Sequence, residues 1–72
     1  MPRLPVLSGK EIIKVLTEIG YRPARQRGSH IRLYHPTKRP ITVPNYQTVS
    51  RGLLRKILRD AGLTPDGFAE YL

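Results

Sequence analysis

The segment Arg25–Pro36 contains both histidines of this chain, together with its densest set of basic and aromatic side chains. Beyond the turn residue Gly28 the pattern predicts a strand, in which every second side chain lies on the same face. His30, Arg32 and Tyr34 therefore share one face at a spacing of about 7 Å, which is roughly one nucleotide. An imidazole, a guanidinium and a phenol arranged in this way suit the binding of a phosphate backbone, where His30 can move a proton.

RNA can be cleaved by its own 2′-hydroxyl group, which attacks the adjacent phosphorus once its proton is removed and the leaving oxygen is protonated. A histidine, with an ordinary pKa of about 6.5, can transfer protons at neutral pH and typically contributes a factor of about 10²–10⁴. Three arginines near His30 can stabilise charge on the phosphate: Arg25, Arg27 and Arg32. The alternative is that His30 is a polar strand residue bonded to a loop carbonyl, because one histidine does not define a site.

Further residues extend the predicted binding surface beyond this row. We expect Ser29 and Lys38 to contact RNA, and we expect Tyr34 to stack on a base, as aromatic platforms do in single-strand binding. A tyrosine that only fills out the sheet surface is the alternative for Tyr34. His35 lies five positions after His30, so strand alternation places it on the opposite face, where we expect it to brace the following turn.

Basic residues also follow one side of the second predicted helix, opposite its apolar arc. Arg51, Arg55 and Arg59 fall on this side, and Tyr46 lies in the polar loop before the helix. These four residues are candidate contacts for RNA or for an acidic protein partner. A solvated helix face is the alternative interpretation of the arginines.

Composition narrows the class of protein. With 72 residues, no cysteine, two histidines and five scattered acids, we expect one small domain over residues 1–72, without disulfides, metal site or cofactor. No apolar run is long enough to span a membrane and the N-terminus lacks a signal-peptide core, so a cytoplasmic location is the default. The net charge of +8 indicates a polyanionic partner, most often nucleic acid, although solubility alone is the alternative.

Hydrophobic periodicity and capping signals predict the elements that position these residues. Residues 1–7 hold two prolines and are expected to form an extended arm, after which the capping box at 8–11 begins a helix that Gly20 ends. Strands are expected over 21–26, 30–35 and 41–43, with Pro23 placing the first at a sheet edge or bulge. A second helix is expected between Ser50 and Gly62, followed by a short helical turn over 64–72.

This order, α-β-β-β-α, predicts an α+β fold in which a three-stranded antiparallel sheet carries both helices on one face. The apolar stripes of the two helices are expected to pack on the sheet face that holds three apolar strand residues, Ile31, Leu33 and Val43.

Five sequence elements together closely resemble the HicA toxins, also called the YcfA-like family. They are Ser8-Gly9-Lys10-Glu11, Arg25-Gln26-Arg27-Gly28-Ser29-His30, His35-Pro36, Thr42-Val43-Pro44 and the segment Gly52–Leu63. The resemblance covers nearly the whole chain in the correct order. It implies a fold like that of double-stranded-RNA-binding domains, cleavage of messenger RNA, and a cognate antitoxin of the HicB family that covers the active site of the toxin.

The same resemblance assigns His30 to the catalytic histidine of the family. Many relatives carry another histidine shortly after the Val-Pro of the third strand, whereas here Val43-Pro44 leads to Asn45 and Tyr46. The resemblance therefore names no second proton-transfer residue for this chain.

Two other functions fit a small basic domain. A non-catalytic module can recognise RNA by shape, through phosphate and 2′-hydroxyl contacts alone. A DNA-binding helix led by the Arg51–Arg59 face is a third possibility, but no helix-turn-helix pair is available to present it.

Overall fold

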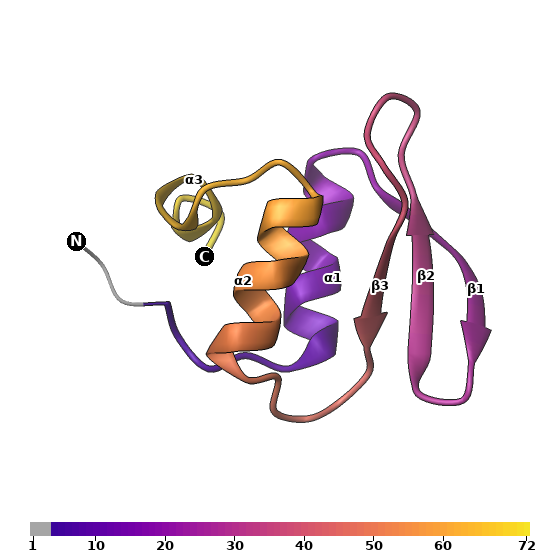
Figure 1. Cartoon of the computed structure of the whole chain (residues 1–72), viewed down its shortest axis with the longest axis horizontal. Coiled ribbons are helices and arrows are strands. Elements are labelled where there is room, and N and C mark those ends of the chain that lie inside the picture. The colour runs from indigo at the N-terminus through magenta and orange to yellow at the C-terminus, as the bar shows by residue number, and fades with distance from the viewer. Residues whose placement is uncertain (1–3) are drawn as a thin grey trace.

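A computed structural model describes residues 4–72 of the chain (Figure 1). Its elements follow the predicted order: α1 Gly9–Glu18, β1 Arg22–Arg27, β2 His30–Tyr34, β3 Ile41–Pro44, α2 Arg51–Asp60 and α3 Pro65–Ala69. The predicted extended arm lies partly outside the described residues, at positions 1–3. None of the helices in residues 4–72 has the length and apolar character needed to cross a lipid bilayer.

The three strands form one antiparallel sheet in the order β1-β2-β3. The helices α1 and α2 both pack against β3, and β1 lies farthest from them (Figure 1). Leu33, Ile41 and Val43 are buried beneath the helices, while Arg32 and Thr42 between them face outward and are exposed. The predicted α+β fold, with both helices on one face of a three-stranded sheet, is therefore confirmed.

The helical stripes expected in the core are buried as predicted. Ile12 and Leu16 of α1, together with Leu54 and Leu58 of α2, are at most 1% exposed. Phe68 of α3 is also fully buried, so the short last helix closes the core at the end of α2. Burial of this kind is the main favourable term in the stability of so small a domain.

The described part of the N-terminal arm packs against the rest of the domain. Leu4 and Leu7 are buried in the core, and Leu7 forms an isolated antiparallel bridge with Val49. The Nε atom of Arg51 donates a hydrogen bond of 2.6 Å to the Leu4 carbonyl oxygen. The described part of the arm is thus packed structure, because its apolar side chains complete a core that the two main helices leave open.

The α1 helix begins with the predicted capping box. The Glu11 carboxylate accepts from the Ser8 backbone N–H at 3.0 Å, and the Ser8 hydroxyl accepts from the Glu11 backbone N–H at 3.2 Å. The bond from the Ser8 backbone, helped by the Ser8 side chain, lowers the pKa of Glu11 below its ordinary value. Gly9 lies against the end of β3, where a Cβ atom would collide with the Pro44 carbonyl oxygen.

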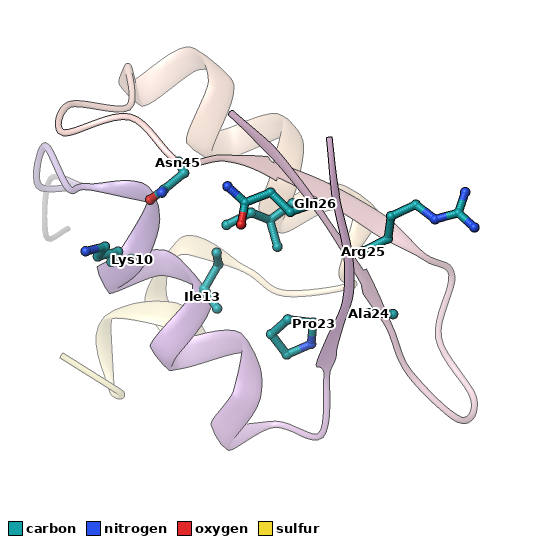
Figure 2. A pocket seen from close by; sticks show the side chains of 8 residues that line it. Lys10, Ile13, Pro23, Ala24, Arg25, Gln26 and Asn45 are labelled. Atoms are coloured by element: carbon teal, nitrogen blue, oxygen red, sulfur yellow. The ribbon is translucent and has the colours of Figure 1, made fainter. Parts of the chain in front are cut away.

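β1 is an edge strand with every residue exposed, and its pairing with β2 shifts register between Pro23 and Arg25. Proline is tolerated at such an edge because it has no N–H to donate. The strand stands away from α1 and leaves between them a groove of about 510 Å³, lined in part by Ile13 and Gln26 (Figure 2). Pro23 was predicted at a sheet edge or bulge, and it lies on the edge strand at the register shift.

The loop between β2 and β3 is tied to the helices by polar contacts. The Nδ1 atom of His35 accepts from the backbone N–H groups of Thr37 and Lys38 at 3.0 and 3.2 Å. Its proton is therefore on Nε2, which lies 3.0 Å from the Ile19 carbonyl oxygen at the end of α1. His35 braces this turn as expected, and β2 ends at Tyr34, one residue before the predicted limit.

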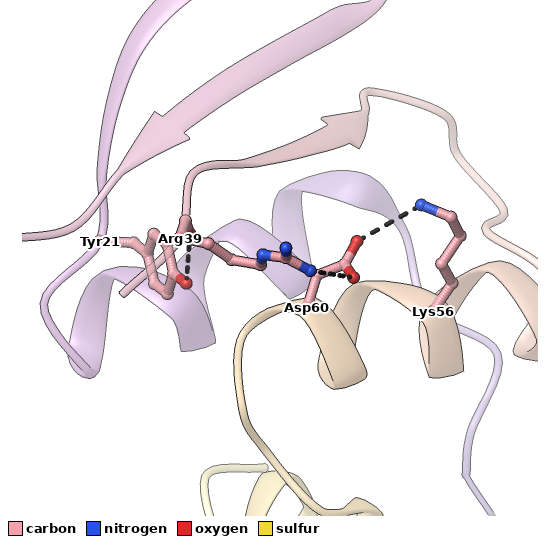
Figure 3. Close-up of polar contacts among 4 residues, drawn as sticks. All are labelled: Tyr21, Arg39, Lys56 and Asp60. Carbon is pink, nitrogen blue, oxygen red and sulfur yellow. Dashed lines mark hydrogen bonds and ion pairs between the residues drawn. The ribbon is translucent and has the colours of Figure 1, made fainter. Parts of the chain in front are cut away.

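Tyr21 and Asp60 also contact the β2–β3 loop, through Arg39 (Figure 3). The buried Tyr21 phenol donates to the Arg39 carbonyl oxygen at 2.9 Å. The Asp60 carboxylate pairs with Arg39 at 3.6 Å and with Lys56 at 3.3 Å. Burial raises the pKa of the Tyr21 phenol, nearby Asp60 adds to this effect, and Arg39 opposes it.

Candidate functional site

The outer face of the sheet carries a shallow depression of about 220 Å³. Its lining contains five of the predicted site residues and one other: Arg25, Arg27, His30, Arg32, Tyr34 and Thr42. Cross-strand pairing brings them together, because Arg27 lies opposite His30 and Arg25 lies opposite Arg32. Gly28 closes the hairpin with φ +59°, a conformation that residues with a side chain rarely adopt.

The guanidinium groups on this face are open to ligands. Arg25 and Arg27 are exposed, and neither forms an ion pair within residues 4–72, where Asp60 is the only acid that pairs with a basic side chain. Their charge is therefore uncompensated by the rest of the described chain. Clustered unpaired cations on one face are the electrostatic footprint of a polyanion-binding surface.

Arg32 is held in place more firmly than its neighbours on β1. Its Nη1 atom donates to the Thr42 hydroxyl at 2.9 Å, and its guanidinium carbon lies 5.9 Å from the centre of the Tyr34 ring. Tyr34 is itself 48% exposed, so one side of its ring is available for stacking. Thr42 was missed from the sequence, although alternation along the third predicted strand places it on this face.

His30 lies at the end of the outer face with an exposed imidazole. Within residues 4–72 its ring forms no hydrogen bond, so both nitrogens are free to meet a ligand. Its aromatic neighbour is Tyr46, with ring centres 6.3 Å apart and planes at 72°. The described structure therefore lacks the bond to a loop carbonyl that was the alternative interpretation of His30.

The loop that carries Tyr46 is fixed by the backbone. The Asn45 N–H donates to the Ser29 carbonyl oxygen at 2.5 Å, and the Gly9 N–H donates to the Tyr46 carbonyl oxygen at 2.8 Å. These two bonds join the β1–β2 turn, the end of β3 and the beginning of α1. Tyr46 is consequently positioned beside His30, although 16 residues separate them in the chain.

Four of the predicted contact residues lie elsewhere. Lys38 is in the β2–β3 loop at the opposite end of the sheet, and its ammonium donates to the Ala61 carbonyl oxygen at 3.1 Å. Arg51 is half-buried and bonded to the N-terminal segment. Arg55 and Arg59 line a separate depression beside the loop that leads to α3, which shares no residue with the depression around His30.

Residues 4–72 contain no group of three or more histidine, aspartate or glutamate side chains placed to hold a metal ion. The outer face presents one imidazole, three guanidinium groups and the phenols of Tyr34 and Tyr46. Such a set can bind a phosphate, place a proton-transfer group beside it and stack on bases.

Two comparisons with known proteins give matches. Residues 9–63 match the sequence profile of a family described as the HicA toxin of bacterial toxin-antitoxin systems. A solved structure described as a toxin-antitoxin complex from Streptococcus pneumoniae contains a chain that is 34% identical, with a TM-score of 0.72. The alignment covers 79% of this chain and 98% of that chain. Curated proteins give no match.

Proposed function

The chain belongs to the HicA family of bacterial toxins, and on this premise we propose that it is an endoribonuclease that cleaves messenger RNA with His30 as its catalytic residue. The observation that carries the proposal is the state of the His30 imidazole. It is exposed, makes no hydrogen bond within residues 4–72, and lines the same depression as Arg25, Arg27 and Arg32. A free proton-transfer group amid unpaired cations is the arrangement that cleavage of a phosphodiester needs.

In the proposed reaction the RNA supplies its own nucleophile. His30 takes the proton of a 2′-hydroxyl as its oxygen attacks the adjacent phosphorus. The bond from phosphorus to the 5′-oxygen then breaks, and that oxygen takes a proton from water. The hydroxide left behind takes the proton from His30, which restores the neutral imidazole. The products are a 2′,3′-cyclic phosphate and a 5′-hydroxyl end, and the guanidinium groups stabilise the charge that builds on the phosphate.

We also propose a HicB-type antitoxin as the protein partner and the cytoplasm, where messenger RNA is found, as the site of action. The solved relative is described as part of a toxin-antitoxin complex. Arg25 and Arg27 of β1 are exposed and form no ion pair within residues 4–72, so they offer an acidic partner a complementary surface. An antitoxin that covers this face would block His30 and the phosphate contacts together.

The test is incubation of single-stranded RNA with the wild-type protein and with His30→Ala and His30→Gln variants, all in EDTA. Glutamine keeps a polar side chain at the site but transfers no proton at neutral pH. We expect cleavage by the wild type, at least a hundredfold slower cleavage by both variants, and cyclic phosphate ends on the products. RNA affinity should remain, because the arginines supply most of the attraction.

Full activity in either folded variant would contradict the catalytic assignment. Products with 5′-phosphate and 3′-hydroxyl ends would contradict attack by the 2′-hydroxyl. Binding without cleavage by the wild type would favour the alternative function, a non-catalytic domain that recognises RNA by shape.

A further inference from the structure

The groove between α1 and β1 is not used by the proposed reaction, and its lining combines apolar side chains with two side-chain amides. Ile13 of α1 and Pro23 of β1 face each other across it, and Ile31 of β2 also contributes apolar surface (Figure 2). The polar ends of Gln26, Asn45 and Lys10 gather at one end of the groove, whereas Arg25 extends away from it. Two apolar walls with amides at one end suit a flat ring that carries hydrogen-bonding groups on its edge.

The amides in the groove have hydrogen-bonding capacity to spare. The Gln26 Nε2 atom donates to the Gly28 carbonyl oxygen at 3.0 Å, which orients the side chain. Its amide oxygen accepts no hydrogen bond within residues 4–72. Within residues 4–72 the Asn45 side-chain amide forms no hydrogen bond. Asparagine and glutamine amides can pair with base edges through a donor and an acceptor at once.

The groove is also coupled to His30 through the β1–β2 turn. Gln26 is bonded to Gly28, and the Asn45 backbone is bonded to Ser29, the residue before His30. The thickness of the sheet at this turn separates the groove from the outer face. Because Asn45 in the groove is bonded to the residue before His30, an RNA strand whose phosphate lies at His30 can pass around the β1–β2 turn and place a neighbouring base in the groove.

A peptide segment is a less suitable occupant. An added strand would pair with the free edge of β1, but Pro23 offers no N–H there and the register shift after it distorts the edge. The exposed Lys10 ammonium forms no ion pair within residues 4–72 and suits a phosphate at the mouth of the groove.

We propose that the α1–β1 groove binds a base next to the scissile phosphate, and that Gln26 and Asn45 read its edge and so determine cleavage preference. The inference rests on the proposed endoribonuclease function. It assigns to this chain a base-recognition subsite separate from the outer face that contacts the phosphate.

Cleavage mapping on a random-sequence RNA tests the subsite directly. Asn45→Ala and Gln26→Ala should each reduce the ratio of cleavage rates at preferred and other bases by about tenfold, the loss expected for one amide–base pair. Gln47→Ala, an exposed amide in the same loop that does not line the groove, serves as the matched control and should leave the preference unchanged. An unchanged preference in both groove variants would overturn the proposal.

A binding measurement separates this proposal from the proposed reaction. In NMR titrations of the His30→Ala protein with the four 5′-nucleoside monophosphates, the side-chain amide signals of Asn45 and Gln26 should shift with some bases and not with others. Shifts confined to Arg27 and Arg32, or identical for all four nucleotides, would overturn the subsite even if the wild type cleaves RNA. Base-dependent shifts without cleavage would support the subsite while the proposed function fails.

The affinity of the groove variants for the antitoxin tests whether the groove contacts protein instead of RNA. If the Asn45 and Gln26 variants lose antitoxin affinity and keep the wild-type cleavage preference, the groove is a protein contact and the proposal is wrong.

Discussion

The two ends of the sheet carry similar polar residues, but the ends differ in whether these residues are hydrogen-bonded or ion-paired within the described chain. At the β2–β3 end, His35, Tyr21, Lys38 and Arg39 all bond to backbone carbonyls, backbone N–H groups or Asp60. At the β1–β2 end, the His30 imidazole and the neighbouring arginines of β1 form no hydrogen bond or ion pair within residues 4–72. One end of the sheet therefore uses its polar groups to stabilise the fold, whereas the other leaves them available to a ligand.

The largest expected effect contrasts the two histidines. His35→Ala removes an acceptor of two backbone N–H groups and a donor to the Ile19 carbonyl, so we expect a loss of about 2–3 kcal/mol of unfolding free energy. His30→Ala should change this free energy by less than about 0.5 kcal/mol, because its side chain is exposed. Urea unfolding of both variants measures the difference.

Equal destabilisation by the two histidine substitutions would remove the distinction between the ends. The unfolding slopes must match that of the wild type for the comparison to hold.

The next effect concerns two cations that the sequence alone treats as equivalent. Arg27→Ala should weaken RNA binding several-fold and reduce the slope of log affinity against log salt by about 0.7, the value for one phosphate contact on a single strand. Lys38→Ala should change RNA affinity less than about twofold, because its ammonium is bonded to the end of α2. Titrations of the His30→Ala protein at several salt concentrations measure both.

A salt slope that falls equally for Lys38→Ala and Arg27→Ala would place Lys38 on the RNA path after all. A stability loss in the Lys38 variant is expected and is measured separately, so that it does not distort the affinities.

A smaller effect concerns the stability contributed by Tyr21 at the β2–β3 end of the sheet. Because burial raises the pKa of Tyr21 in the folded state, the unfolded chain loses this proton first, and stability should fall as pH rises above about 10. Tyr21→Phe should lower the free energy of unfolding by about 1 kcal/mol at neutral pH, because the bond to the Arg39 carbonyl is lost. The stability of this variant should fall less steeply with rising pH than that of the wild type. Thermal unfolding between pH 8 and 11 measures both effects, and parallel alkaline declines would contradict the assignment.

The smallest effect lies at the start of α1. The pKa of Glu11 is lowered in the fold, so its contribution to stability is present above its ordinary value of 4.5 and is lost as pH falls through the lower folded value. Glu11→Gln keeps an acceptor for the Ser8 N–H and should flatten this acid-side decline. Unfolding midpoints between pH 2 and 6 measure it, with Glu18→Gln as the exposed control.

The order of the amino acids was enough to predict the fold class, both main helices with their caps, and the face on which His30, Arg32 and Tyr34 lie. These features depend on local periodicity and on hydrogen bonds between residues three positions apart, which are visible in the order of the amino acids. The strand limits were correct to within one residue at each end. The resemblance to HicA toxins likewise depended on short motifs in the correct order, and the family match confirms it.

Which polar side chains are already hydrogen-bonded within the domain could not be predicted before the packing of the chain was known. Lys38 and Arg51 look as available as Arg27 in the sequence, yet each donates to a carbonyl oxygen that is 23 or 47 residues away. The position of Tyr46 beside His30 and the α1–β1 groove also depend on backbone bonds between distant segments. Such partners are chosen by the packing of the whole chain, and no local pattern specifies which carbonyl oxygen will lie within reach of a given side chain.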